Sequence, residues 1–464
     1  MSQSSRARTG ALAEPIRCFK AYDVRGRVPE ELDEVLAYRI ARAYAEFIAA
    51  REVCMGRDVR NSSIAIADAV AEGLMDAGVR VRDLGLCGTE ETYFATFDGG
   101  LDGGVMITAS HNPADYNGLK FVRQQAHPLS ADTGLIDIRR RAEAGIFVAP
   151  PAPGERIEAG DKSAYLDHLM SYVDPARLKP LKLVVNAGNG CAGTIGKRLA
   201  ERLPFEFVTL DFEPDGDFPN GVPNPMLKAN RQRTAEQVRA VGADLGIAWD
   251  GDFDRCFFFD ETGAFVEGYY IVGLLAEIFL DRHPGAKILH DPRLTWNTID
   301  IVTRHGGTPV VVKSGHAFMK EKMRTAGCVY GGEMSAHYYF ERFGYCDSGM
   351  IPWLLVASLI STSERTLAEL VREREALYPV SGEINRRVED VPGVLQAVER
   401  YYAARKPKIE RMDGLSMEFD RWRFNLRPSN TEPLLRLNVE SRGDRELMLH
   451  QTGELLGLMG GKPE

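Results

Sequence analysis

The stretch VRVRDLGLCGTEETYFATFDGGLDGGVMITAS, residues 79–110, decides the fold class of this chain. Residues 79–85 (VRVRDLG) and 104–110 (GVMITAS) are strand-like, whereas residues 89–97 (TEETYFATF) form a helical stretch. A helix between two strands is typical of a mostly parallel α/β sheet. We therefore expect the N-terminal part of the chain to form an α/β domain.

The same alternation precedes this stretch. Apolar residues fall at helical spacing between residues 29 and 51, and a short strand-like run follows at residues 53–55. A second helix is expected from Asn61, a good N-cap residue, to a stop at Gly78.

Strands and helices alternate again further along the chain, which predicts two more α/β units related to the first. The strand-like runs lie at residues 181–188, 243–250, 287–292 and 308–315, and helices are expected from Thr194, at 296–306 and at 316–327. The Pro/Gly-rich residues 148–160 form the clearest linker, and a second join is expected near residues 378–382.

The pattern changes after that second join. Two strand-like runs, residues 415–420 (LSMEFD) and 434–441 (LLRLNVES), surround RWRFNLRPSNTEP between helical stretches. This order predicts a smaller α+β domain with an antiparallel sheet. The expected fold class is therefore α/β, with three related mixed-sheet domains and a C-terminal α+β domain.

Composition and charge exclude several classes of partner. The net charge of -9 argues against nucleic acid and anionic membranes, which require a basic surface. The longest apolar run, residues 269–280, is too short to span a membrane and carries Glu277, so a buried helix is expected there. The seven scattered cysteines contain no CxxC pair and favour a reducing, cytoplasmic location. Residues 1–14 are expected to be a polar extension.

A first candidate for chemistry is Thr108-Ala-Ser110-His111-Asn-Pro113, directly after a predicted apolar strand. Loops at the carboxyl ends of strands in an α/β sheet present side chains to ligands. Ser110 is therefore a plausible nucleophile. For this motif taken alone, an ordinary polar turn closed by Asn-Pro is the simpler interpretation.

A second candidate is the loop Asp250-Gly-Asp252-Phe-Asp254-Arg255. If the loop is extended, alternate residues point the same way and the three carboxylates converge. Hard oxygen ligands suit Mg²⁺, and three carboxylates leave positions for water and a phosphate oxygen.

Two alternatives for such loops remain open. An EF-hand calcium loop would also use these aspartates with Glu261, but Arg255 stands where that loop needs glycine and a strand-like run follows. A dinucleotide site is suggested by Gly188-Asn-Gly-Cys-Ala-Gly193, which matches GxGxxG after a predicted strand, although a tight strand-to-helix turn explains these glycines too.

Two further loops carry groups suited to a sugar phosphate. In residues 331–337 (GGEMSAH), Glu333, Ser335 and His337 alternate, so a carboxylate and a hydroxyl could grip sugar hydroxyls from one face, although a polar sheet edge is the simpler interpretation. In RPSNTEP, the guanidinium, hydroxyl and amide groups suit a phosphate dianion, although a surface turn is again the alternative; these groups belong to Arg427, Ser429, Asn430 and Thr431. Further polar or cationic loop residues are Arg25, Lys120, Lys313 and His316.

Taken together, TASHNP, DGDFDR, GEMSAH and RPSNTEP resemble, in this order and spacing, the four signature loops of the α-D-phosphohexomutase superfamily, from about Cys18 to the C-terminus. GTEETYFATF, DPRLTWNT and GGEMSAHYYF resemble in particular bacterial phosphomannomutases that feed GDP-mannose synthesis. The resemblance implies four domains around one central cleft, which we place at residues 1–158, 159–264, 265–376 and 377–464.

The resemblance also implies roles for individual residues. Ser110 would carry a phosphoryl group and bind Mg²⁺ with Asp250, Asp252 and Asp254. Glu333 and Ser335 would bind sugar hydroxyls, and the non-transferring phosphate would be held by Arg427, Ser429, Asn430 and Thr431. Residues lining the cleft would be Tyr22, Arg25, His111, Lys120, Arg255, His316 and His337; we count Arg25 and His111 with the catalytic group and take Lys120 and His337 as candidates for moving the hydroxyl proton. Arg293 would belong to the substrate-binding residues; it stands where relatives often have lysine, and because arginine differs in reach and fork geometry we do not expect acid-base chemistry there.

The reaction implied is the reversible conversion of mannose 1-phosphate into mannose 6-phosphate through a phosphoserine and a hexose 1,6-bisphosphate, which also serves as activator. Glucose phosphate is the nearest alternative substrate, alone or together with mannose phosphate. A phosphatase, a nucleotide-dependent oxidoreductase and a non-catalytic sugar-phosphate binder are the other classes considered. We expect a small-molecule partner only, and a monomer or weak homodimer.

Overall fold

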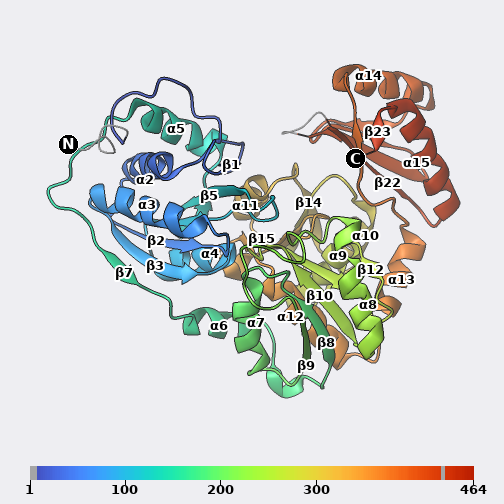
Figure 1. Ribbon diagram of the computed structural model, residues 1–464. Helices are drawn as coiled ribbons and strands as arrows, with labels where there is room; N and C mark the ends of the chain where they lie inside the picture. Colours follow the sequence, from blue (N-terminus) through green and yellow to red (C-terminus); the bar gives the residue numbers. More distant parts are fainter. Residues whose placement is uncertain (1–7, 430–433, 464) are drawn as a thin grey trace. The chain divides into compact units, whose positions relative to one another are not determined.

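The computed structural model describes residues 8–429 and 434–463 and divides into two compact units. The first unit comprises the chain up to Phe265 together with Arg342–Ser363, and the second comprises Val266–Glu341 and the chain from Glu364 onward. Figure 1 labels the elements of both units.

The first sheet of the first unit has the strand order β1-β5-β4-β2-β3-β7, with β6 paired to β5. Strand β2 runs parallel to β3 and β4, whereas β5 is antiparallel to β4 and β1, so the sheet is mixed. Its strands are β1 (Val24–Arg27), β2 (Glu52–Arg57), β3 (Arg80–Leu86), β4 (Gly103–Ile107), β5 (Tyr116–Arg123), β6 (His127–Pro128) and β7 (Arg156–Glu158). The helices around it are α2 (Glu34–Ile48), α3 (Ser63–Asp76), α4 (Thr89–Asp98), α5 (Leu135–Ala144) and α6 (Ser163–Met170).

Helices α2 and α3 pack side by side and share one apolar core with this sheet (Figure 1). The predicted N-cap of α3 was wrong, because the helix begins at Ser63 and its N-cap is Ser62. Asn61 instead donates from its Nδ2 to Asp217 Oδ1 at 2.6 Å. The Asn61 side chain therefore forms a long-range hydrogen bond and does not cap the helix.

The second sheet of the first unit has the order β12-β11-β10-β8-β9. Strand β8 is parallel to β9 and β10, and β11 is antiparallel to β10. Its elements are β8 (Lys182–Asn186), α7 (Ala192–Ala200), β9 (Glu206–Leu210), α8 (Gln232–Val241), β10 (Leu245–Trp249), β11 (Cys256–Phe259) and β12 (Phe265–Val266). The segment with β17 (Cys346–Asp347) and α12 (Met350–Thr362) also belongs to this unit, and Trp249 Nε1 donates to its Gly349 carbonyl at 2.9 Å.

The second unit contains four strands of a further mixed sheet, in the order β14-β13-β15-β16. Strand β13 is parallel to β14 and β15, and β16 is antiparallel to β15. The elements are α9 (Gly268–Arg282), β13 (Lys287–His290), α10 (Trp296–Arg304), β14 (Thr308–Val311), α11 (His316–Ala326), β15 (Cys328–Gly332), β16 (Tyr338–Phe340) and α13 (Leu367–Leu377).

The C-terminal sheet of the second unit has the order β19-β20-β21-β22-β18-β23, and its neighbouring strands are antiparallel. Helices α14 and α15 pack against each other, and their apolar side chains share a core with the sheet (Figure 1). The elements are β18 (Ile384–Arg387), α14 (Val391–Tyr402), β19 (Lys408–Glu410), β20 (Leu415–Glu418), β21 (Trp422–Pro428), β22 (Leu434–Ser441), α15 (Arg445–Met459) and β23 (Lys462–Pro463).

The predicted fold class is confirmed: three sheets are mixed and the C-terminal sheet is antiparallel. The predicted buried helix at 269–280 is confirmed as α9, most of which is buried. Two segments differ from expectation. Residues 156–158 of the predicted linker form edge strand β7, and residues 422–428 form β21, because Trp422, Phe424 and Leu426 alternate into the core. In the described part of the chain, no helix is both long and apolar enough to cross a bilayer.

Candidate active site

Ser110 lies in the loop after β4, with an unusual backbone conformation. Its φ is +50°, in the left-handed region that residues other than glycine rarely adopt. The Ser110 N–H donates to Thr108 Oγ1 at 2.8 Å, and the Ser110 hydroxyl donates to Asp250 Oδ2 at 2.7 Å. The structure thus brings the predicted nucleophile against the predicted metal loop, and only 4% of the residue is exposed.

Arg60 holds this loop by its backbone. The residue is 1% exposed and follows β2, whose parallel neighbour β4 leads into the Ser110 loop. Its two terminal nitrogens donate to the carbonyl oxygens of Pro113 (2.6 Å), Tyr116 (2.9 Å), Ser110 (2.9 Å) and Asn112 (2.6 Å). One guanidinium therefore fixes the loop on both sides of the serine, since its rigid fork presents several donors at once.

A buried carboxylate balances the Arg60 charge. Asp58 Oδ2 lies 3.2 Å from Arg60 Nε, and Asp58 Oδ1 accepts hydrogen bonds from the Arg60 N–H at 3.0 Å and from the Ser63 hydroxyl at 2.5 Å. Sequence reasoning missed both residues. The available signal was their position: GRDVR follows a strand, and parallel neighbouring strands end at the same edge of the sheet.

The three aspartates of the 250–255 loop converge, as expected. One oxygen of each of Asp250, Asp252 and Asp254 lies within 4.8 Å of the others, and all three residues are buried. The geometric reason proposed from the sequence was wrong, because the loop is a turn and not extended. Phe253 has a φ of +44°, and its N–H donates to the Asp250 carbonyl at 3.1 Å.

Lys120 contributes a positive charge to this cluster. Its Nζ donates to Asp252 Oδ2 at 2.7 Å and to Asp254 Oδ2 at 2.6 Å. Burial alone would lower the pKa of Lys120, but the two carboxylates outweigh it and raise the pKa above its ordinary value. In this structure Lys120 is an ammonium group among carboxylates.

The donor set fits a divalent cation. Asp252 Oδ1 is buried without a hydrogen-bond partner among residues 8–429 and 434–463, although Oδ2 accepts from Thr89 Oγ1 at 2.5 Å. Burial raises the pKa of Asp252, but the Lys120 ammonium lowers it by more. The pKa therefore lies below its ordinary value, and the carboxylate is ionised. A buried acidic cluster with an unsatisfied oxygen suits a hard cation that prefers oxygen ligands.

His111, Arg255 and Arg25 complete the surroundings of Ser110. The Ser110 hydroxyl lies 3.0 Å from His111 Nδ1, which Arg255 Nη2 also contacts. Burial, together with Arg255 and Arg25, holds the pKa of His111 well below its usual range. A guanidinium can only donate, so Nδ1 is an acceptor and the imidazole is neutral.

Arg25 and Tyr22 lie near the start of β1. Arg25 donates to Asn112 Oδ1 at 2.6 Å, within the Ser110 loop, and to Asp23 Oδ2 at 2.5 Å. Arg255 also donates to Asp250 Oδ2, from Nη2 at 2.8 Å and from Nε at 3.0 Å. Tyr22 lies in the bend before β1. The first unit thus gathers Arg25, Ser110, His111, Lys120, Arg255 and the three aspartates.

In the second unit, Arg293 links two of the predicted sugar-binding residues. Its Nη2 donates to Ser335 Oγ at 3.1 Å and to Glu333 Oε1 at 3.4 Å, and its guanidinium is paired with Asp291. The loop carrying Glu333 and Ser335 is a turn, in which Ala336 has a φ of +68°. The expectation of an extended loop was therefore wrong here too, although the two side chains do meet at one guanidinium.

Glu333 also contacts residues that lie next to the predicted histidines. Its Oε1 accepts from the Gly315 N–H at 2.8 Å, next to His316 at the start of α11, and its Oε2 accepts from the Tyr339 hydroxyl at 2.6 Å. The His337 ring stacks on Tyr339 with a centroid distance of 6.2 Å. Glu333, His316 and His337 therefore belong to one neighbourhood.

Glu383 gathers three arginines and was missed by sequence reasoning. Its carboxylate lies 3.1 Å from Arg427, 3.3 Å from Arg436 and 3.7 Å from Arg293. Burial raises the pKa of Glu383, but these arginines outweigh it and hold the pKa below its ordinary value. Arg293 is also paired with Asp291, but Arg427 and Arg436 share the Glu383 carboxylate, and these two cations against one carboxylate leave an excess of positive charge suited to an anion. Ser429 donates from its N–H to the Leu434 carbonyl at 2.8 Å; Asn430 and Thr431 lie outside the described residues.

The structure bears on the two alternatives, a dinucleotide site at Gly188–Gly193 and an EF-hand at the aspartate loop. A Cβ at Gly190 would lie 2.7 Å from the Gly251 carbonyl oxygen, and one at Gly193 would lie 1.9 Å from the Phe212 carbonyl oxygen, so close packing requires these glycines. The EF-hand alternative was wrong, because β11 begins at Cys256, directly after the aspartate loop.

Four family models match the chain in sequence order. They are described as phosphoglucomutase/phosphomannomutase alpha/beta/alpha domain I at residues 17–147, domain II at 163–263, domain III at 267–378, and the C-terminal domain at 383–454.

Full-length relatives agree with these matches. The chain is 57% identical to a phosphomannomutase of Salmonella montevideo over 451 residues, which covers 96% of this chain and 99% of the relative. It is 55% identical to a phosphomannomutase of Escherichia coli K12, and 58% identical to a Xanthomonas campestris protein named phosphohexose mutases, with the same coverage.

Solved structures show the same fold. A phosphoglucomutase/phosphomannomutase family protein of Burkholderia thailandensis matches with a TM-score of 0.85 and 30% identity, over 96% of this chain and 98% of that chain. An Aspergillus fumigatus N-acetylphosphoglucosamine mutase matches with a TM-score of 0.65 and 15% identity, over 98% of this chain and 97% of that chain, a likeness that concerns the fold alone.

Proposed function

The chain belongs to the phosphoglucomutase/phosphomannomutase family, and from this membership we propose that it isomerises mannose 1-phosphate and mannose 6-phosphate. The relatives named phosphomannomutase, 51–57% identical over nearly the whole chain, support mannose as the sugar. Glucose phosphate, alone or together with mannose phosphate, is the alternative substrate, because other relatives are named phosphohexose mutases, a name that does not specify the hexose. Its product, mannose 1-phosphate, would feed GDP-mannose synthesis.

The observation that carries the proposal is the contact of Ser110 with two acceptors. Asp250 Oδ2 lies 2.7 Å and the neutral His111 Nδ1 lies 3.0 Å from the Ser110 hydroxyl. Asp250 accepts the hydroxyl hydrogen bond and would take the proton as the oxygen attacks a phosphorus atom, so Ser110 is prepared as a nucleophile; His111 Nδ1 lies beside it but already accepts from Arg255. Arg255 and Arg25 then supply positive charge near the phosphoryl oxygens.

The carboxylates of Asp250, Asp252 and Asp254 would hold Mg²⁺ together with an oxygen of phosphorylated Ser110. When bound, Mg²⁺ would offset the negative charge that develops on the transferring phosphoryl group. In the first transfer Lys120, as the amine, would take the proton of the attacking sugar hydroxyl. In the second transfer the resulting ammonium group would give that proton to the leaving sugar oxygen. His337 is the second candidate for this proton.

The second unit supplies groups for the rest of the substrate. Glu333 and Ser335 would bind sugar hydroxyls, with Arg293 holding both side chains. The non-transferring phosphate would bind Arg427, Ser429, Asn430 and Thr431, and it would compete with Glu383 for the Arg427 guanidinium. His316 would serve as a further donor beside Glu333, and Tyr22 as one beside Arg25.

The proposed reaction consists of two phosphoryl transfers. Phosphorylated Ser110 gives its group to the free end of the sugar phosphate, which forms a hexose 1,6-bisphosphate. The bisphosphate then turns end for end, and Ser110 takes the other phosphate back. The bisphosphate would therefore also activate enzyme that has lost its phosphoryl group.

The test is a turnover assay of mannose 1-phosphate and glucose 1-phosphate, with and without hexose 1,6-bisphosphate. Ser110→Ala should abolish turnover, whereas Ser171→Ala, a change of an exposed serine of the same unit, should leave it unchanged. Turnover that survives in Ser110→Ala, or free phosphate as the main product, would contradict the proposal. Preference for glucose 1-phosphate would replace mannose by the alternative sugar.

We further propose a cytoplasmic enzyme that is a monomer or weak homodimer and needs no nucleic acid or membrane partner. The net charge of -9 and the burial of all seven cysteines support this proposal. Light scattering after size exclusion would measure the oligomeric state directly.

A further inference from the structure

Arg423 and Glu440 form a buried ion pair in the C-terminal sheet. They are direct cross-strand partners on β21 and β22, with exposures of 4% and 0%. Arg423 Nη1 donates to Glu440 Oε1 at 2.7 Å. The guanidinium and the carboxylate also form hydrogen bonds with other groups, and these groups lie in one loop outside the C-terminal sheet.

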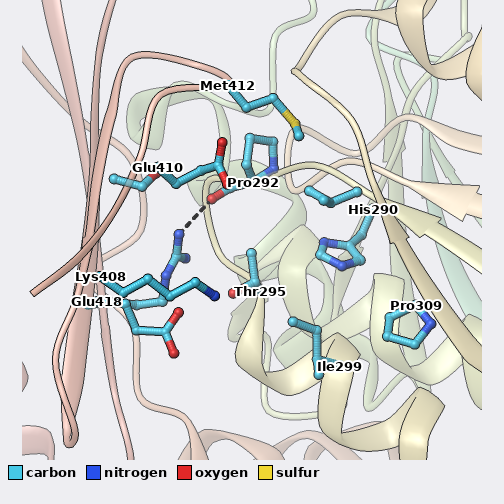
Figure 2. Close-up of a pocket in the computed structure, with 12 residues that line it drawn as sticks. His290, Pro292, Thr295, Ile299, Pro309, Lys408, Glu410, Met412 and Glu418 are labelled. Carbon is cyan, nitrogen blue, oxygen red and sulfur yellow. Dashed lines mark hydrogen bonds between the residues drawn. The ribbon is translucent and has the colours of Figure 1, made fainter.

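Arg423 binds the carbonyl groups of that loop. Its Nη2 donates to the Pro292 carbonyl at 2.9 Å, the dashed line in Figure 2, and its Nη1 donates to the Arg293 carbonyl at 3.0 Å. The loop follows β13, which belongs to the other sheet of the second unit. Arg423 therefore fixes the backbone from which the Arg293 side chain projects.

Glu440 binds the N–H groups that follow. It accepts from the Thr295 N–H at 2.7 Å and from the Trp296 N–H at 3.2 Å, while the Tyr269 hydroxyl donates to it and accepts from the Asn297 N–H at 2.6 Å. These are the first N–H groups of α10, whose N-cap Thr295 makes no side-chain capping bond. Glu440 thus caps α10 from another sheet, where the helix dipole also favours a negative charge.

The surroundings of the pair are not closely packed. A cavity of about 180 Å³ lies beside the Arg423–Pro292 hydrogen bond (Figure 2). One wall comes from the segment with His290, Thr295 and Ile299, and the other from the strands with Lys408 and Glu418. Because apolar packing is incomplete on this side, the hydrogen bonds of the pair contribute a larger share of the contact.

We propose that Arg423 and Glu440 are positioning residues. Through their hydrogen bonds, the position of Arg293 depends on the C-terminal sheet being packed against the loop that follows β13. Arg293 in turn holds Glu333 and Ser335, so all three sugar-binding groups are ordered only while that sheet is in place. The inference rests on the proposed function, because it concerns residues proposed to bind the sugar.

The test is amide hydrogen exchange of the full chain, read on the peptide that contains residues 293–298. Glu440→Gln should raise exchange there at least about tenfold, because a neutral amide accepts from these N–H groups more weakly than a carboxylate. Tyr269→Phe is a milder second variant that keeps the ring and should raise exchange a few-fold. Arg421→Ala, which removes an exposed ion pair with Asp444, is the matched control and should change nothing in this peptide.

Kinetics separate positioning from mere loss of stability. With mannose 1-phosphate, Glu440→Gln should raise KM about tenfold and change kcat less, whereas a merely destabilised enzyme loses active molecules without changing KM. Arg423→Lys, which keeps the charge but not the fork, should fall between the parent and Glu440→Gln. Unchanged exchange in a folded Glu440→Gln, or in Tyr269→Phe if Glu440→Gln does not fold, would overturn the inference. If the parent shows no mutase turnover, the proposed function fails, while the exchange result still decides whether the pair orders the loop.

Discussion

Two buried arginines hold the two loops on which the proposed chemistry depends, and they do so in different ways. Arg60 and its partner Asp58 follow β2, next to the strand that leads to Ser110. Arg423 and its partner Glu440 lie in the C-terminal sheet, whereas the Arg293 loop that they hold follows β13 of another sheet. The first arrangement is local to one sheet, and the second joins two sheets.

This difference means that the Ser110 loop keeps its hydrogen bonds in any arrangement of the sheets, whereas the Arg293 loop keeps its hydrogen bonds only while two sheets stay together. The Ser110 loop cannot leave Arg60 without disruption of the sheet that carries both. The Arg293 loop can lose Arg423 and Glu440 if the C-terminal sheet moves as a body, with each sheet intact. A nucleophile that must keep its geometry through two transfers suits the first arrangement, and a substrate that must turn between them suits the second.

The largest expected effect is that of Arg60→Ala. The change leaves Asp58 as an uncompensated buried charge and removes the donors to four carbonyl groups, so it should destabilise the first unit by about 3–5 kcal/mol. Urea unfolding measures this loss. Arg51→Ala is the control, because Arg51 is 90% exposed and lies 3.9 Å from Asp102. A loss below about 1 kcal/mol for Arg60→Ala would show that the Ser110 loop does not depend on it.

Lysine substitutions should sharpen the contrast between the two arginines. Arg60→Lys keeps a charge beside Asp58 but cannot reach four carbonyl groups, so kcat should fall at least about tenfold, equivalent to ~1.4 kcal/mol, with little change in KM. Arg423→Lys should chiefly raise KM. Steady-state assays of both variants, side by side, measure the difference. Equal changes of kcat and KM in the two variants would remove the distinction.

A smaller effect is expected when the pH is lowered, which should reduce the stability of the first unit. Burial lowers the pKa of His168, among the rings of Phe94 and Phe343, to about 4, with a further contribution from Arg342. The unfolded chain takes up this proton below its ordinary value of 6.5, and the folded chain does not. Stability should therefore be constant above pH 6.5 and fall as the pH falls from 6.5 toward 4.

His168→Phe should remove this part of the acid sensitivity, and His283→Phe, a change of an exposed histidine of the second unit, should not. Urea midpoints measured at pH 7, 6, 5 and 4.5 provide the comparison. Parallel curves for the parent and His168→Phe would show that this histidine is not neutral in the fold.

The smallest effect is expected for an ion pair that holds no loop. Arg421 and Asp444 lie 2.6 Å apart, but the Arg421 side chain is 67% exposed. Arg421→Ala should change stability by less than about 1 kcal/mol, because water screens exposed pairs. Thermal unfolding compared with Glu440→Gln tests this. A loss equal to that of Glu440→Gln would mean that any pair in this sheet is equally important.

Sequence patterns predicted the sheets and the chemical groups better than the reasons for their geometry. Ser110 and the aspartates were predicted as site residues because polar residues follow apolar strands, a local signal. The turns of the aspartate loop and of the Glu333 loop, however, depend on left-handed backbone at Phe253 and Ala336 respectively, and these residue types do not predict such a conformation. Extended loops were therefore the wrong explanation.

The holding residues were missed for a different reason. Arg60 is 50 positions from Ser110, and Glu440 is 145 positions from Thr295. Charged residues in strands or loops are usually solvated, so only the fold shows that these are buried against backbone groups. β21 was not predicted as a strand because its alternate positions carry Arg423 and Asn425, whose buried partners, the Arg293 carbonyl and the Ser416 hydroxyl, lie elsewhere in the chain.

The central claim is that Ser110 carries the phosphoryl group between the two ends of a mannose phosphate. The most direct measurement incubates the enzyme with phosphorus-labelled hexose 1,6-bisphosphate, maps the label by peptide mass spectrometry, and then adds mannose 1-phosphate. The account predicts label on Ser110 alone, and its transfer to the sugar as labelled bisphosphate when mannose 1-phosphate arrives. Label on another residue, or label lost from Ser110 only to water, would contradict it.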